Sequence, residues 1–284
     1  MNPKLFEQKV KQTIQKYKLL EKGDKVLVAS SGGKDSTTVL YLLHKFGYKP
    51  EALHINLRMG KWSEENLANL EQFCKNNGIS LHVFDIRKLL GYSICYIKEV
   101  VRSRSKLKQC TICGVLRRWL LNRLARKLQA DKIATGHNLD DASQTVLMNW
   151  FKGNLFIGAN EGPKVGIVED KKFVQRIKPL YFCLEKDVEA YSKSMNFPVL
   201  YQRCPCVQGA YRHEVRNMLN KLKKENNDIK ASIVKNFLRI LPKLRQQVAS
   251  SNLRYCKFCG EPSRNEACKA CLIIQNFKNT QNSL

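Results

Sequence analysis

Short apolar runs alternate along the chain with longer segments whose apolar residues recur at helical spacing. The short runs end in small or polar residues, which is typical of buried strands, and they cover residues 25–30, 51–56, 80–85 and 132–135. The helical patterns begin after Ser36 and continue over 64–77, 115–129 and 141–151. Because strands and helices alternate and crossovers are right-handed, the pattern predicts an α/β fold with a doubly wound parallel sheet.

The rest of the chain divides into segments of different character. Residues 4–20 and 185–196 predict further helices, while 153–172 contain four glycines and predict a loop or hairpin. We expect an N-terminal helix over 1–20, an α/β domain over 21–210, a basic helical extension over 211–250 and a small cysteine-rich module over 251–284.

The net charge says more about possible partners than the composition does. Fifty Lys and Arg residues against 24 Asp and Glu give a net charge of +26, spread over segments that are predicted to fold. A field of that sign attracts polyanions, and nucleic acid is the first candidate, although a solubility surface is the alternative. The 43% of hydrophobic residues suffices for a core, which excludes a disordered chain. The absence of an apolar run of about 18 residues predicts no membrane span.

Eleven cysteines are grouped rather than scattered. Close pairs occur at Cys110 and Cys113, and at Cys204 and Cys206. Such pairs suit metal or redox chemistry in a reducing compartment, so we expect a cytoplasmic protein. Near the end of the chain, two CxxC pairs are separated by eight residues and supply Cys256, Cys259, Cys268 and Cys271. Four thiolates at this spacing predict a structural Zn²⁺ ribbon, with two disulfides or free thiols as the alternative.

A glycine-rich turn follows the first predicted strand. It contains Ser31, Gly32, Gly33, Lys34, Asp35 and Ser36. Two glycines let backbone N–H groups approach an oxyanion, and the helix that follows adds partial positive charge. The spacing is not that of a Walker A loop. A glycine turn with helix-capping residues is the structural alternative to a phosphate site.

A second polar element follows the strand at 132–135. In Thr135–Asp141 (TGHNLDD), Gly136 permits close approach of a nucleotide, and Asp140 and Asp141 could hold Mg²⁺ against phosphates. The two carboxylates equally suit a helix N-terminus. Cys110 and Cys113 lie just before the helix at 115–129, where its dipole depresses thiol pKa values. A redox pair, half of a zinc site and part of an iron–sulfur site all remain open for them.

These motifs together resemble a known family. The sequence SGGKDS is similar to the signature of the PP-loop ATP pyrophosphatases, which cleave ATP to AMP and pyrophosphate. The order CxxCGxxRR, TGHNLDD and a later Cys204–Pro205 resembles the TtcA/TtuA group of tRNA 2-thiolation enzymes. The resemblance implies a tRNA uridine 2-sulfurtransferase that adenylates the base. The resemblance also implies tRNA as partner, a homodimer, and a sulfur-carrier protein or free sulfide as donor.

The resemblance also assigns residues. It implies a [4Fe–4S] cluster on Cys110, Cys113 and Cys204, or persulfide sulfur carried there, with Cys206 as a substitute ligand or spare thiol. Arg117 and Asp141 match catalytic positions. The positions that match ATP contacts are Ala29, Ser31, Gly32, Gly33, Lys34, Asp35, Ser36, Ile55, Arg117 and Gly136, with Mg²⁺ beside them.

One departure leaves the target nucleotide open. Members of the group commonly carry a zinc finger before the first strand, whereas this chain has no cysteine before Cys74. The thiolated position, 34 or 54, therefore stays undecided. Two rival functions also stay open. One is another PP-loop adenylating enzyme, such as a tRNA lysidine synthetase or an amide-forming ligase. The other is a non-enzymatic zinc-ribbon RNA-binding protein.

Overall fold

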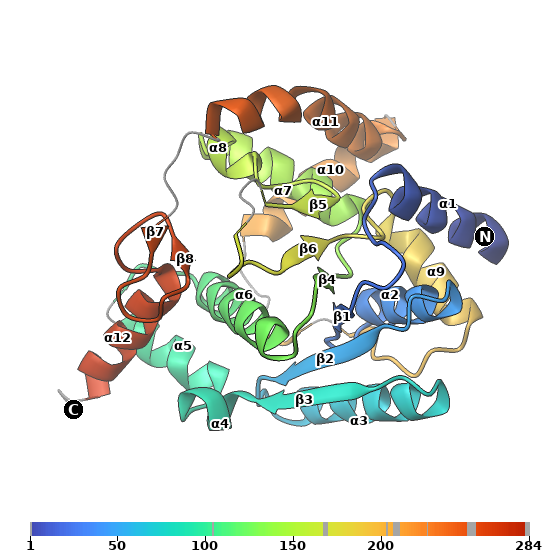
Figure 1. The fold of residues 1–284 in the computed structure, drawn as a ribbon. Coiled ribbons are helices and arrows are strands. Elements are labelled where there is room, and N and C mark those ends of the chain that lie inside the picture. The colour runs from blue at the N-terminus through green and yellow to red at the C-terminus, as the bar shows by residue number, and fades with distance from the viewer. Residues whose placement is uncertain are drawn as a thin grey trace.

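The computed structural model describes residues 2–103, 105–166, 170–202, 204–206, 211–225, 227–248 and 254–281. A six-stranded sheet in the order β3-β2-β1-β4-β6-β5 runs through its centre (Figure 1). The strands are β1 (Val26–Ala29), β2 (Glu51–Asn56), β3 (Leu81–Asp85), β4 (Lys132–Ala134), β5 (Lys164–Val165) and β6 (Gln175–Ile177). All neighbours are parallel except β5 and β6, so the predicted doubly wound α/β fold is confirmed.

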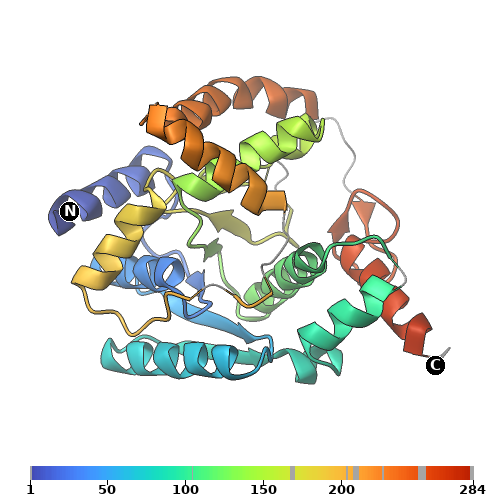
Figure 2. The ribbon, with the colours of Figure 1, turned by 180° about the vertical axis from the view of Figure 1, so that it is seen from behind.

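Helices cover both faces of this sheet (Figures 1 and 2). One apolar cluster joins one face to α1 (Pro3–Lys16), α2 (Lys34–Lys45), α3 (Lys61–Asn76) and α9 (Glu185–Ser194). A second cluster joins the other face to α5 (Ile94–Ser103), α6 (Gln109–Lys127) and α12 (Lys269–Gln281). The short α4 (Ile86–Leu90) links β3 to α5. No helix among the described residues combines the length and apolarity that crossing a lipid bilayer requires.

The predicted basic extension forms two helices rather than one continuous segment. They are α10 (Tyr211–Glu225) and α11 (Ile229–Val248), and they lie beside α7 (Leu139–Phe151) and α8 (Leu155–Gly158) at one end of the sheet (Figure 1). Phe237 and Leu241 of α11 pack on Val146 of α7 in a small separate core. This core joins the extension directly to the helix that follows the TGHNLDD element.

The cysteine-rich module is a small ribbon whose helix packs against α5 and α6. Strands β7 (Arg254–Tyr255) and β8 (Pro262–Ser263) pair in antiparallel fashion, and α12 follows them. Ala270, Ile273 and Phe277 of α12 are buried in the cluster beneath α6. The Arg126 guanidinium of α6 also forms an ion pair with the buried Glu261 carboxylate of the ribbon. The ribbon is therefore packed against the helix that carries the CxxC motif.

Candidate active site

The glycine-rich turn lies between β1 and α2, at the carboxyl edge of the sheet. Ser31 N–H donates to Ser36 Oγ at 3.2 Å, and Ser36 Oγ donates to the Gly33 carbonyl at 3.1 Å. Gly32 has a φ of +81°, and a Cβ there would lie 2.5 Å from the Asn66 carbonyl oxygen. The turn is thus closed by its own serines, and only glycine fits at its buried corner.

Gly136 brings the second predicted element against this turn. A Cβ on Gly136 would lie 2.7 Å from Ser36 N and 2.8 Å from the Asp35 carbonyl carbon. Asn138, which caps α7, also donates its amide to Asp35 at 3.1 Å. The sequence placed both elements at strand ends, and the structure brings them into direct contact.

This contact gives a testable prediction for Gly136. In Gly136→Ala the methyl group meets backbone atoms that cannot rotate away, so the glycine-rich turn must shift. We expect kcat/KM for ATP to fall about a hundredfold, because moving a preorganised binding group by about 1 Å lowers the rate by roughly that factor. The matched control is Gly158→Ala on α8, where the nearest atom to an added Cβ lies 3.6 Å away. Equal ATP kinetics in the two variants would contradict the prediction.

The two aspartates of TGHNLDD have different surroundings. Asp140 is buried, accepts from Lys230 Nζ at 2.5 Å and from the Glu185 backbone N–H at 2.8 Å, and so faces α11 and α9. Asp141 lines the cavity beside the turn and pairs with Arg212 at 3.3 Å. Burial chiefly raises the pKa of Asp35, and the nearby Asp141 carboxylate adds to that rise. The carboxylates that approach each other are thus Asp35 and Asp141, whereas Asp140 has a structural partner.

The CxxC motif lies inside the first turn of α6, because that helix begins at Gln109 rather than at 115. Cys110 is exposed and its Sγ contacts the Cys206 carbonyl oxygen at 3.6 Å. Burial raises the pKa of Cys113, while Arg117 and Lys98 act to lower it. The helix N-terminus and these cations thus oppose the effect of burial on the Cys113 thiol.

One cavity connects Cys110 and the CxC pair, Cys204 and Cys206, with the glycine-rich turn. This cysteine cavity, of about 1000 Å³, is lined by Gly33, Lys34 and Asp35 on one side and by Cys110, Cys204 and Cys206 on another. Lys34 Nζ pairs with Asp35 at 2.9 Å and with Glu185 at 3.3 Å at this wall. Cys110, Cys204 and Cys206 therefore face the same space as the glycine-rich turn, whereas Cys113 does not line it.

Two further residues near the thiols were not singled out from the sequence. Lys98 is buried, and its ammonium interacts with Cys206, Cys95 and Cys113. Cys95 is hydrogen-bonded to Cys206 although its position in the sequence is isolated. Their spacing along α5, one turn apart, is also the spacing of ordinary core residues, so no local signal distinguished them.

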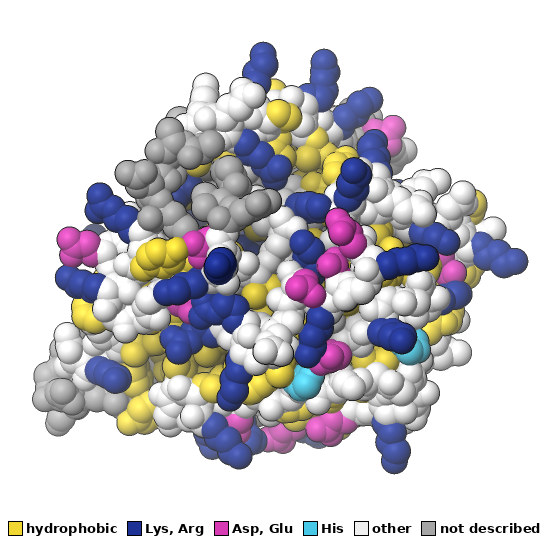
Figure 3. All heavy atoms as spheres, viewed as in Figure 1, with side chains coloured by type: hydrophobic (Ala, Val, Ile, Leu, Met, Phe, Trp, Pro, Cys, Tyr) yellow, Lys and Arg dark blue, Asp and Glu magenta, His cyan; other side chains and the backbone are white. Residues whose placement is uncertain are grey.

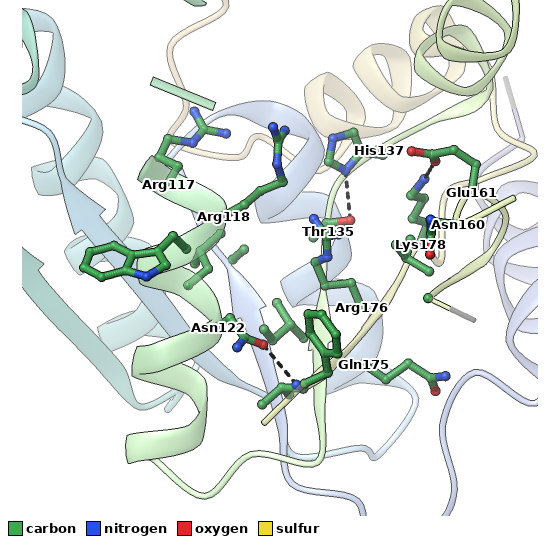
Figure 4. A pocket seen from close by; sticks show the side chains of 18 of the residues that line it. Arg117, Arg118, Asn122, Thr135, His137, Asn160, Glu161, Gln175, Arg176 and Lys178 are labelled. Carbon is green, nitrogen blue, oxygen red and sulfur yellow. Dashed lines mark hydrogen bonds and ion pairs between the residues drawn. The ribbon is translucent and has the colours of Figure 1, made fainter. Parts of the chain in front are cut away.

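A larger cavity lies beside the first and opens over the sheet. This sheet cavity, of about 1490 Å³, extends from Ser31 and Ser36 past Gly136 to Arg264 of the ribbon. Asp35, Gly114, Arg118 and Arg212 line both cavities. Figure 4 shows that Arg117 and Arg118 enter the sheet cavity from α6, with Thr135, His137 and Lys178 on other walls. The protein atoms around His137 desolvate its imidazole and lower its pKa, although the side chain is exposed where the cavity opens.

The remaining predicted nucleotide contacts are divided. Ala29 and Arg117 line the sheet cavity together with Gly136 and Asp141. Ile55 instead packs against the apolar cluster under α6 and lines neither cavity. Arg212 and Arg216 of α10 were missed from the sequence, since a lysine- and arginine-rich helix marks no single position. Arg216 pairs with Glu185 at 3.4 Å, so α10 contributes to the same charged network as Lys34.

The four ribbon cysteines converge as their spacing predicts. The Sγ atoms of Cys256, Cys259, Cys268 and Cys271 all lie within 4.8 Å of one another. Burial acts to raise the pKa of Cys256, but backbone N–H groups that donate to its sulfur lower it to about 6. Four thiols in this arrangement match the ligand set of a tetrahedral Zn²⁺ site. Among the residues that the structure describes, this is the only group of three or more metal-ligating side chains that converge in this way, so Cys110, Cys113 and Cys204 are not brought together as closely.

Comparison with known proteins places this geometry in a family. Residues 3–222 match the PP-loop domain family. The tRNA-5-methyluridine(54) 2-sulfurtransferase of Pyrococcus horikoshii is 35% identical over 94% of this chain and 83% of its own length. Cytoplasmic tRNA 2-thiolation protein 1 of Caenorhabditis elegans is 30% identical over 98% of this chain and 74% of its own length.

A solved structure extends the match to three dimensions. The U34-tRNA thiolase NcsA of Methanococcus maripaludis, solved with its [4Fe–4S] cluster, superposes with a TM-score of 0.78 at 28% identity, covering 96% of this chain and 87% of its own. The family resemblance deduced from SGGKDS, CxxCGxxRR and TGHNLDD is thus confirmed. The chain belongs to the PP-loop family, alongside its tRNA 2-thiolation members.

Proposed function

We propose that this protein is an ATP-dependent tRNA uridine 2-sulfurtransferase. The observation that supports this best is the cysteine cavity, because one space is lined by the phosphate loop and by Cys110 and Cys204. All three relatives named above are tRNA thiolation proteins or sulfurtransferases by name, and two of the names specify a uridine, at position 54 or 34. A PP-loop enzyme that only forms amides needs no thiols in that space.

ATP is the first substrate in this proposal. Backbone N–H groups of the glycine-rich turn and the N-terminus of α2 would hold its phosphates. Asp35 and Asp141 line the same cavity, and burial raises the pKa of Asp35, with the Asp141 carboxylate adding to the rise, so this carboxylate pair fits a divalent cation, and Mg²⁺ would be held there. The uridine O2 would attack the α-phosphorus, forming one P–O bond while the bond to pyrophosphate breaks. Arg117 and Arg212 would stabilise the developing charge.

Sulfur chemistry is assigned to the three central cysteines. Cys113 faces Arg117 and Lys98, and Cys204 lies among Cys206, Cys113 and Lys98, so cations surround thiols that would bind as thiolates. This donor set fits an iron–sulfur cluster better than Mg²⁺ or Ca²⁺. When bound through Cys110, Cys113 and Cys204, a [4Fe–4S] cluster would offer an open iron for sulfide that replaces AMP at C2. The chain's own part is to hold the adenylated base beside that position.

The remaining assignments belong to the same proposal. The ribbon cysteines would hold structural Zn²⁺, and tRNA would be the nucleic-acid partner of a cytoplasmic homodimer. The sulfur would arrive as free sulfide or on a sulfur-carrier protein. The Lys and Arg side chains spread over the face in Figure 3 fit a polyanionic partner of this kind.

The test is reconstitution under anaerobic conditions with ATP, sulfide and an unmodified tRNA transcript. We expect 2-thiouridine in digested tRNA, measured by mass spectrometry, and pyrophosphate release that depends on tRNA. Pyrophosphate release without any thionucleoside would instead favour another PP-loop ligase. RNA binding without pyrophosphate release would favour a non-enzymatic RNA-binding protein.

A further inference from the structure

An arginine occupies an unusual place on the sheet. Arg176 of β6 is in register with Ile133 of β4, which is in register with Leu27 of β1. Residues in register on parallel strands point to the same face, and Leu27 and Ile133 belong to the apolar cluster beneath α6. The next residue, Ile177, belongs to the cluster on the opposite face. Arg176 thus places a cation in line with Leu27 and Ile133, two residues of the apolar core.

The space over Arg176 is open because α6 does not reach it. Arg176, Gln175 and Val165 form the floor of the sheet cavity, and Arg118 of α6 enters from the side (Figure 4). Desolvation lowers the pKa values of both arginines, and the charges of Arg176 and Arg117 lower that of Arg118 further, while the Glu161 carboxylate acts to raise both. The nearby Glu161 carboxylate is bound to Lys178 Nζ at 2.5 Å. Within the described ranges no carboxylate forms an ion pair with Arg118 or Arg176.

This pair of guanidinium groups is set back from the phosphate loop. Arg176 is level with Leu27, two residues before Ala29, and two strands away from β1. At about 3.3 Å per residue and about 4.8 Å per strand, it lies roughly 7 Å below and 10 Å beside the end of β1. The cavity of about 1490 Å³ also exceeds the roughly 300–1,000 Å³ that a single small-molecule ligand occupies. The space therefore accommodates a second anionic group besides the nucleotide.

We propose that Arg118 and Arg176 bind a backbone phosphate of the tRNA strand that flanks the target uridine. The proposal rests on the proposed function and assigns a place to its RNA substrate. Guanidinium groups bind phosphate oxygens in pairs, and an RNA strand carries its charge on every nucleotide. With the phosphate on the floor of the sheet cavity, the adjoining base can reach the space that Asp35, Gly114 and Arg118 share between both cavities.

The experiment measures tRNA affinity of Arg176→Gln without ATP, over a series of salt concentrations, with the full-length protein and an unmodified tRNA transcript. We expect the Kd to rise about tenfold, because one charge-assisted hydrogen-bonding group is lost. The slope of log K against log salt should become shallower by about 0.7–0.9 for that contact. Arg176→Lys should keep the wild-type salt slope and recover part of the affinity. The Kd for a non-hydrolysable ATP analogue should not change.

The matched control is Arg87→Gln, an exposed arginine of α4 beside the opposite edge strand that lines neither cavity. It should leave both the Kd and the salt slope at wild-type values. Circular dichroism of each variant confirms that the fold is kept. The proposal is overturned if Arg176→Gln binds tRNA as the wild type does, or if its loss of affinity is for the ATP analogue instead. An acidic protein partner in this cavity would give the first of these results.

The outcomes separate this proposal from the function itself. A wild-type protein that binds tRNA no better than an unrelated RNA hairpin would contradict the proposed function. A wild type that makes 2-thiouridine while Arg176→Gln binds tRNA normally would contradict only the phosphate site.

Discussion

Cys113→Ser should abolish thiolation while ATP binding stays within about twofold of the wild type. Cys113 lies in the first turn of α6 among Arg117, Lys98 and the other central thiols, and it does not line either cavity beside the phosphate loop. Loss of one of the three proposed ligands would leave no complete set for the proposed cluster. We expect the rate of 2-thiouridine formation to fall by more than roughly a thousandfold, as when one member of an interdependent catalytic unit is removed.

The readouts for this variant are iron content after anaerobic reconstitution, thionucleoside mass spectrometry and the Kd for ATP. Cys74→Ala is the control, because Cys74 is buried in the core of the opposite sheet face and far from the central thiols in the fold. It should keep iron and activity at a small cost in stability. Full thiolation by Cys113→Ser would contradict the assignment of the cluster to this cysteine.

Cys256→Ser should remove zinc from the protein and unfold the ribbon. A segment with two strands of two residues each has too small a core to fold alone, so the Zn²⁺ proposed above would supply its folding free energy. Loss of the ribbon would uncover the apolar surface now covered by Ile273 and Phe277, and would leave Arg126 without its carboxylate. For about 4 kcal/mol of lost stability, Tm should fall by roughly 10 °C.

Zinc content by plasma mass spectrometry and a thermal melt measure this effect. Cys95→Ser is the matched control, because Cys95 is an exposed thiol of α5 outside the four-sulfur group. It should retain one zinc ion per chain and the wild-type Tm. Stoichiometric zinc in Cys256→Ser, or an unchanged melt in its absence, would show that the ribbon does not depend on the metal.

The sequence predicted those parts of the fold whose signals are local. The first four parallel strands are short apolar runs bounded by polar turns, and the glycine-rich turn requires glycine at Gly32 for a steric reason that acts within a few ångströms. A loop or hairpin was predicted over 153–172, and β5 does pair with β6 in antiparallel fashion, but the two strands themselves were not located because they contain only two and three residues, one of which is Arg176. No periodicity can be recognised over so few positions.

Other features depend on contacts between distant segments. Which aspartate of TGHNLDD is buried depends on Lys230, ninety positions later in the chain. The start of α6 was placed too late because Lys108, its N-cap, makes no side-chain capping bond that a sequence pattern would mark. The proximity of Cys95 and Lys98 to the central thiols likewise depends on how α5 packs against α6.

The buried pair of Asp140 and Lys230 has a consequence for how such a protein can evolve. Replacing only one of these two residues by a neutral one would leave the other charge buried and unpaired, which costs about 3–5 kcal/mol of folding stability. Substitutions at these two sites should therefore be inherited jointly, and helix α11 cannot be exchanged for an unrelated segment while the aspartate stays. Helix α11, which lies far along the chain from the glycine-rich turn, is therefore expected to evolve together with the element that follows β4.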